Sequence, residues 1–451
     1  MNVTTDRADS AHEPVREKAG NSMSAFQYWL VFLCFLVVLL DGLDTLATGF
    51  VASSLARDLG VPHAALGPFL SMALIGMTVG ALIAGPLADR VGRKPVLVGS
   101  VLLFGMCTMW CAAGDSIFML TLLRLLTGLG LGGAMPCAGT LLSEYMPTSR
   151  RSFFTNLMYC GFPLGASLGG FLAAIIIPHC GWRGMFFLGG VAPLALAAAL
   201  FTIPESVRLM KARNWPATKI IRVASRFPAG IVDIETGVAA PEVDKQKAGG
   251  LRMILSGPFL PATMLMWLAY FGGLLVFYLQ TSWLPTLLQG AALDAGQSAF
   301  VVALLPFGGV LGTLVCGWTL DRFSPYRVVA CTFVLGAISL FVASHSLGNV
   351  TQLSTAMFAS GIFLVGAQSS MLSLAMGLYP TSCRATGSAW MLGVGRTGGI
   401  VGALTGGYLL HGGLSLQEVM GLLASIALVA AASVAICGVV TRHVVDGRLS
   451  R

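Results

Sequence analysis

The sequence predicts an all-α polytopic membrane protein with twelve transmembrane helices in two six-helix halves. Of its 451 residues, 56% are hydrophobic and only 10% are charged. A soluble domain carries about 25% charged residues, which it needs to cover its surface with polar groups. The composition therefore excludes a soluble globule, and it also excludes a disordered chain. An internal repeat, described below, predicts the division into halves.

Twelve apolar runs of about 20 residues are long enough to cross a bilayer as helices. They begin near residues 27, 66, 94, 117, 152, 182, 257, 296, 326, 351, 385 and 415. The predicted domains are an N-tail (1–26), an N-terminal half (27–204), a polar linker (205–255), a C-terminal half (256–441) and a C-tail (442–451). The N-tail lacks the pattern of a cleavable signal peptide, so the first apolar run is expected to direct insertion.

Basic residues gather on one side of the predicted bundle. With the N-terminus inside, the inner side holds 23 of the 27 Lys and Arg residues, nine of them in the linker. Cytoplasmic loops carry such an excess, so both termini are expected in the cytoplasm. The net charge of +8 is then a topology signal, and no nucleic-acid partner is expected. The ten cysteines lie mostly in apolar runs and are expected to be free thiols.

The two halves repeat short motifs. Residues 85–90 read Gly-Pro-Leu-Ala-Asp-Arg at the end of the second span, and residues 317–322 read Gly-Trp-Thr-Leu-Asp-Arg at the end of the eighth, 232 residues later. Pro-Thr-Ser recurs at 147–149 and 380–382, an offset of 233. Both copies face the same side, which indicates a parallel repeat about the membrane normal and a transport site between the halves.

The common catalytic and nucleotide-binding motifs are missing from the sequence. It contains no Gly-Lys dipeptide of a P-loop, no zinc-protease motif and no CxxC. We therefore expect neither an enzyme nor a bound metal or cofactor. Uphill transport would have to draw on an ion gradient.

Ionisable side chains within the spans are the main functional candidates, because burying one charge there costs at least about 2.5 kcal/mol. Asp41 and Asp44 share a face of the first span and are candidates for proton coupling, with structural hydrogen bonding as the alternative. Arg124 in the fourth span needs an anionic partner, either one of these aspartates or a substrate carboxylate. Arg396 in the eleventh span suits a carboxylate ligand, with snorkelling to the membrane surface as the alternative.

Glu144 lies near the inner end of the fourth span. It could carry a proton, or it could pair with Arg93, Arg150 or Arg151 in an inner gate. The sequence leaves these two roles open.

Residues 85–94 form the most specific motif of the chain. A tight turn is expected at Gly92, and Asp89 is expected to pair with an arginine as a charged latch that breaks when the cavity opens inward. The predicted gating residues are Gly85, Asp89, Arg90, Gly92, Arg93, Asp321 and Arg322. The aromatic candidates for substrate binding are Tyr270, Phe277 and Trp390, with Phe271, Tyr278, Gln280 and Trp283 considered beside them.

The motif at 85–94, the six-plus-six layout and the glycine run after Arg124 resemble the major facilitator superfamily. Asp41-Gly42-Leu43-Asp44 resembles the DGxD signature of its aromatic acid:proton symporters, and residues 283–286 (Trp-Leu-Pro-Thr) are also similar to that family. Residues 204–208 are shared more loosely with sugar porters. The resemblance implies a major facilitator fold and uptake of benzoate-like acids with protons across a bacterial inner membrane.

Carried over residue by residue, the resemblance matches Asp41, Asp44, Arg124 and Glu144 to positions important for transport, and Arg396 to the family's charged eleventh span. The partners it implies are a small aromatic carboxylate, protons and the lipid bilayer, and a monomer is expected. Our hypothesis is that protonation of the aspartate pair frees Arg124 to help admit the anion. Arg396 would then clamp the carboxylate from the other half.

Three alternatives stay open at this point. The first is an exporter of drugs or metabolites by proton antiport, which the Arg124 glycine run permits and the DGxD pair disfavours. The second is a sugar or organic-acid porter of the same superfamily. The third is a sensor that transports nothing, although such proteins usually carry an added signalling domain.

Overall fold

The computed structural model describes residues 23–147, 150–227, 253–255, 259–291, 293–320, 322–346, 348–379 and 383–449. The regular structure in these residues is entirely helical. Ten of the helices are long and apolar enough to cross a membrane. One of the ten runs over 48 residues and holds two helices joined by a kink at Gly181, and α16 (Arg384–His411) is a further long helix. Counting these gives the twelve helices that the sequence predicts.

The first helix group contains the elements α2 (Ala25–Leu59), η1 (His63–Ala65), α3 (Leu66–Val91), α4 (Arg93–Cys111), α5 (Ile117–Tyr145), α6 (Arg151–Tyr159) and α7 (Gly161–Leu200). Within the group α2 lies along α7 and α3 lies along α5. The glycine run of α5 permits this approach, because a Cβ on Gly128 or Gly132 would collide with backbone oxygens of α3.

The second helix group contains α11 (Phe259–Gly290), α12 (Ala295–Leu320), α13 (Pro325–Ser344), α14 (Val350–Ser360), η2 (Gly361–Val365), α15 (Gly366–Leu378), α16 (Arg384–His411) and α17 (Leu416–Leu449). The short element η2 is a π-helix that joins α14 to α15 within one continuous span. In this group α11 lies along α16 and α13 lies along α17.

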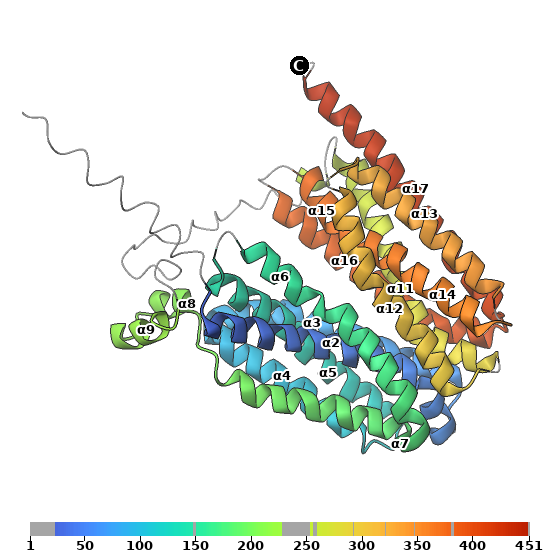
Figure 1. Cartoon of the computed structure of the whole chain (residues 1–451), viewed down its shortest axis with the longest axis horizontal. Helices are drawn as coiled ribbons and strands as arrows, with labels where there is room; N and C mark the ends of the chain where they lie inside the picture. The colour runs from blue at the N-terminus through green and yellow to red at the C-terminus, as the bar shows by residue number, and fades with distance from the viewer. Residues whose placement is uncertain are drawn as a thin grey trace, which may run out of the picture.

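Two short helices, α8 (Val207–Ala212) and α9 (Ala217–Ala224), follow the first group. They fall within the segment predicted as a polar linker, of which residues 228–252 lie outside the described residues. We call the end of the bundle where α8 and α9 lie the linker end, and the opposite end the far end. Figure 1 shows the two helix groups as two blocks that meet at the far end and diverge towards the linker end.

Contacts between the two groups gather at and near the far end. A Cβ on Gly49 of α2 would collide with the Thr281 backbone oxygen of α11, and one on Gly67 of α3 would lie 3.0 Å from the Leu404 oxygen of α16. The Ser53 hydroxyl of α2 donates to the Gln289 side chain of α11 at 2.7 Å. The two groups therefore contact each other at and near the far end, and their backbones diverge towards the linker end (Figure 1).

Candidate functional site

The centre of the first helix group holds a buried ion pair between Asp44 of α2 and Arg124 of α5. Arg124 Nη1 lies 3.0 Å from Asp44 Oδ2, and the two side chains are 0% and 1% exposed. Arg124 Nη2 donates to Asp44 Oδ1 at 3.3 Å and to Thr108 Oγ1 at 3.0 Å. The Thr108 hydroxyl in turn donates to Asp44 Oδ1 at 2.8 Å. The guanidinium also lies 5.0 Å from the ring centre of Phe186.

This network supplies one of the anionic partners that the sequence predicts for Arg124. In the described conformation its partner is an aspartate of the first span, and the guanidinium has no exposed surface for a ligand. Removing one member of such a buried pair costs about 3–5 kcal/mol, because the other charge stays buried without a partner.

Asp41 lies one helical turn before Asp44 and is 0% exposed. The Thr45 hydroxyl donates to Asp41 Oδ1 at 3.2 Å, whereas Asp41 Oδ2 has no hydrogen-bond partner among the described residues. Asp41 is within electrostatic reach of Asp44 and of Arg396, which belongs to the second helix group. A buried carboxylate with an unused oxygen is costly unless it is protonated or acquires a partner.

Arg396 is half-buried near the middle of α16, between two glycines that receive tyrosine rings from α11. A Cβ on Gly395 would collide with the ring of Tyr270, and one on Gly399 would lie 2.6 Å from Cδ2 of Tyr278. Both tyrosines are within electrostatic reach of Arg396, and Tyr278 is also within reach of Asp41. The structure thus brings the predicted residues Asp41, Arg396 and Tyr270 together from three helices of both groups.

The other aromatic candidates extend from this cluster along α11 and α16. The Phe277 ring packs edge-on against Tyr278, with ring centres 5.3 Å apart. Trp390 stacks on Trp267 at 5.9 Å, nearer the linker end, and it is 44% exposed. Phe277 therefore lies beside the central cluster, whereas Trp390 lies six residues before Arg396 on α16, just under two helical turns away.

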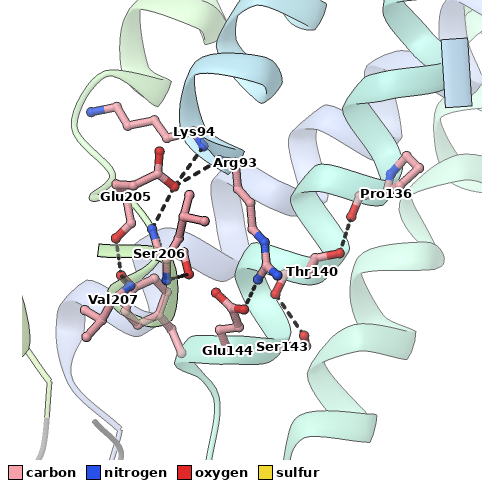
Figure 2. Close-up of polar contacts among 11 residues, drawn as sticks. Arg93, Lys94, Pro136, Thr140, Ser143, Glu144, Glu205, Ser206 and Val207 are labelled. Carbon is pink, nitrogen blue, oxygen red and sulfur yellow. Dashed lines mark hydrogen bonds and ion pairs between the residues drawn. The ribbon is translucent and has the colours of Figure 1, made fainter. Parts of the chain in front are cut away.

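The gating motif connects α3, α4 and the start of the linker. Gly92 has a φ of 129°, which an L side chain rarely adopts, and it ends α3 one residue before α4 begins. The Glu205 carboxylate accepts hydrogen bonds from the backbone N–H groups of Arg93 at 3.0 Å and Lys94 at 3.3 Å, so it caps the N-terminus of α4 (Figure 2). A Cβ on Gly92 would collide with this carboxylate.

Arg93 forms an ion pair with Glu144, drawn in Figure 2, so of the three arginines proposed for Glu144 this one is its partner. The side chains of Asp89 and Arg90 are exposed, and the Asp89 backbone oxygen accepts a hydrogen bond from Arg213 at 3.2 Å. A Cβ on Gly85 would meet only open space.

The second copy of the motif is described only in part. Arg322 lies with its guanidinium carbon 3.9 Å from the ring centre of Trp318. Asp321 lies outside the described residues.

Sequence reasoning missed three residues that the structure places at these sites. The sequence singled out Glu205 only through the loose similarity of residues 204–208 to sugar porters. That its carboxylate caps the N-terminus of α4 could be seen only in the folded structure. Thr108 completes the Asp44–Arg124 network. Gln368 of α15 donates to the Tyr270 backbone oxygen at 3.2 Å. A threonine or glutamine in an apolar run gives no signal of a contact made with another helix.

Comparisons with known proteins identify the family of this chain. The sequence matches the family described as Major Facilitator Superfamily over residues 33–325 and 288–448. It is 45% identical to the 4-hydroxybenzoate transporter PcaK of Pseudomonas aeruginosa, over 93% of this chain and 94% of that one. It is 42% identical to the gallate transporter of Pseudomonas putida, over 91% and 92% of the two chains.

A solved structure shows the same fold at low sequence identity. The inward-open xylose transporter XylE from E. coli superposes with a TM-score of 0.69 and 17% identity, covering 90% of this chain and 95% of that one. The family match spans nearly all of the helical region, and the fold agrees with it. The chain therefore belongs to the Major Facilitator Superfamily, as a multi-pass membrane transporter and not an enzyme.

Proposed function

We propose that the protein takes up a small aromatic carboxylate, such as a hydroxybenzoate, together with protons by alternating access. The observation that supports this most directly is the placement of Asp41 and Arg396. One carboxylate oxygen of Asp41 is buried and has no hydrogen-bond partner among the described residues, and Arg396 lies within its electrostatic reach on the other helix group. Relatives named as 4-hydroxybenzoate and gallate transporters support the substrate class.

Charge balance couples the proton to the substrate in this proposal. In the empty site the negative Asp41 and the positive Arg396 stabilise each other. A substrate carboxylate that binds Arg396 neutralises the positive charge that had stabilised Asp41. Asp41 is then negative, buried and within electrostatic reach of Asp44 without compensation. Protonation of Asp41 removes that cost, so the anion and the proton each favour binding of the other.

The two aspartates have different roles in this scheme. Asp44 keeps its ion pair with Arg124 and fixes the first helix group, while Asp41 binds and releases the proton. Arg396 binds the carboxylate, and Tyr270, Phe277 and Tyr278 line the ring. Arg124 acts by holding Asp44 in place, which is a narrower role than direct substrate contact. Trp390 lies nearer the linker end, on the path by which substrate leaves.

Alternating access would exchange the contacts at the two ends. In the described conformation the groups meet at the far end through contacts such as Ser53 with Gln289. Asp89 is free to enter a latch with the second group when the linker end closes. Glu144 is assigned to the linker-end gate through its ion pair with Arg93, and not to the proton path.

We also infer that the linker end faces the cytoplasm of a bacterial inner membrane, and that one chain is sufficient for transport. The basic loops support the orientation. Cys180, exposed beside the kink at Gly181, provides a test of orientation. A membrane-impermeant maleimide should label it in intact cells, and Cys180→Ser should lose that label; labelling only after permeabilisation would reverse the orientation.

Uptake of labelled 4-hydroxybenzoate into expressing cells, with and without a protonophore, tests the function. Saturable uptake that the protonophore abolishes is expected. Benzoate, gentisate and protocatechuate would be tried next if 4-hydroxybenzoate were not taken up. Failure of all four, with the protein present in the membrane, would overturn the proposal. Efflux of a loaded substrate in exchange for protons would establish the exporter instead.

A further inference from the structure

Gln280 of α11 is a buried polar side chain whose hydrogen-bonding groups are unused. It is 1% exposed, and neither its amide nitrogen nor its amide oxygen has a hydrogen-bond partner among the described residues. A carboxamide offers two donors and one acceptor oxygen, and burying it unpaired is unfavourable. A leucine or methionine would fill the same space without that cost. The amide is therefore best explained by a ligand that pairs with it.

A second amide group lies against the same helix. Gln368 of α15 donates through its nitrogen to the Tyr270 backbone oxygen at 3.2 Å, and its own oxygen is buried with no hydrogen-bond partner in the part of the chain that the structure describes. That oxygen lies so close to α11 that a Cβ on Gly273 would collide with it. The lack of a side chain at Gly273 makes room for this amide.

Helix geometry places Gln280 on the face of α11 against which Gln368 of α15 packs. Gln280 follows Gly273 by seven residues, which is two helical turns, so the two positions point in nearly the same direction about 10 Å apart along the axis. Tyr270, which Gln368 contacts, is also within electrostatic reach of Arg396. Neutral hydrogen-bonding groups thus lie on the helix that carries the tyrosines of the charged cluster.

We propose that Gln280 and Gln368 recognise hydroxyl groups on the ring of the bound acid, so that the site prefers hydroxylated aromatic acids to unsubstituted ones. The inference rests on the proposed function and concerns the same site. A phenolic hydroxyl donates one hydrogen bond and accepts others, which a carboxamide can match at both atoms. A site with such groups disfavours an analogue that lacks the hydroxyl, because the buried amide then stays unpaired.

The alternative is that these amides hold the substrate carboxylate. The two assignments predict different behaviour for benzoate, which has the carboxylate but no ring hydroxyl. If the amides recognise the hydroxyl, their removal spares benzoate. If they hold the carboxylate, their removal weakens every aromatic acid alike.

The test compares kcat/KM for 4-hydroxybenzoate and benzoate in proteoliposomes of wild type, Gln280→Met and Gln368→Met. Methionine keeps the length of glutamine and removes the amide. The wild type should favour 4-hydroxybenzoate by at least about tenfold, and each variant should reduce that ratio at least about tenfold with benzoate transport unchanged or improved. Gln297→Met, at an exposed glutamine of α12, should leave the ratio unchanged.

Three results would overturn the inference. If a variant lost kcat/KM equally for both acids, the amides would bind the carboxylate or serve the structure alone. If the ratio of kcat/KM for the two acids were unchanged in both variants, the amides would take no part in recognising the hydroxyl. Competition in the wild type needs no variant: equal inhibition of uptake by benzoate and by 3- and 4-hydroxybenzoate would contradict the preference. If the wild type moved no aromatic acid at all, the proposed function would fail, and this inference with it.

Discussion

Asp41 and Asp44 lie one turn apart on α2, but only Asp44 is paired with a guanidinium. Both oxygens of Asp44 accept hydrogen bonds from Arg124, whereas one oxygen of Asp41 has no partner among the described residues. Two identical side chains on one helix face thus occupy different electrostatic environments. This difference makes their roles separable by mutation.

We expect Asp44→Asn to destabilise the protein and Asp41→Asn to leave its stability nearly unchanged. The first substitution leaves the buried Arg124 charge without its partner, at a cost of about 3–5 kcal/mol. The second replaces an incompletely paired carboxylate with a neutral amide. Thermal unfolding of the purified variants in detergent measures both effects. Equal destabilisation by the two substitutions would contradict the division of roles.

Transport measurements should also distinguish the role of Asp41 from that of Asp44. Asp41→Asn should abolish proton-driven accumulation but keep exchange of labelled for unlabelled substrate, because substrate can still bind and the groups can still move. Counterflow in proteoliposomes without a pH gradient measures the exchange, and uptake with a gradient measures the accumulation. Full accumulation by Asp41→Asn would remove Asp41 from proton coupling.

Arg396→Lys should raise KM about tenfold, and Arg396→Gln should reduce kcat/KM at least about a hundredfold. Lysine keeps the charge but loses the bidentate geometry, while glutamine loses both. Initial rates of uptake over a range of substrate concentrations separate KM from kcat. Arg57→Gln, at the exposed far end of α2, is the matched control and should behave like wild type. Unchanged KM in both Arg396 variants would mean that another group binds the carboxylate.

Gly92→Ala should disrupt the junction between α3, α4 and the linker. The new Cβ would collide with the Glu205 carboxylate, and alanine disfavours a φ of 129°. Together these effects should cost about 1–3 kcal/mol and strongly reduce uptake. Gly99→Ala within α4, where a Cβ meets open space, is the control for the glycine-to-alanine change. If the two variants behaved alike, the tight fit at Gly92 would be unimportant.

Gly398→Ala should separate α11 from α16 and lower stability by about 1–3 kcal/mol, because its Cβ would collide with the Phe271 backbone oxygen. Gly393→Ala on the same helix has open space for its Cβ and should be neutral or slightly stabilising. Thermal unfolding of both variants makes the comparison. Similar unfolding temperatures would show that the helices can move apart without cost.

The helices could be predicted closely because hydrophobic length alone determines where a chain can cross a bilayer. The predicted span starts near 27, 117 and 415 correspond to helices that begin at Ala25, Ile117 and Leu416. The sixth span, expected from 182, begins at the Gly181 kink. Such boundaries are local properties, so no tertiary contact is needed to find them.

The partners within the site could not be predicted with the same success. Asp41 and Asp44 are equivalent by spacing, and only the position of α5 relative to α2 decides which of them meets Arg124. Glu205 reaches the N-terminus of α4 from more than a hundred residues away in sequence. Contacts of this kind depend on how helices pack, which hydropathy does not encode.

The π-helix at Gly361–Val365 changes the direction in which the side chains of α15 point relative to those of α14. A single added residue in a helix turns everything after it by about 100°. Gln368 follows this element by three residues, so its direction towards Tyr270 depends on the insertion, whereas α14 keeps its own contacts with α12 and α13. Loss of one residue here would rotate Gln368 away from Tyr270. If Gln368 recognises the ring hydroxyl as we propose, the length of the backbone at this one point sets the substrate preference, without any change of side chain.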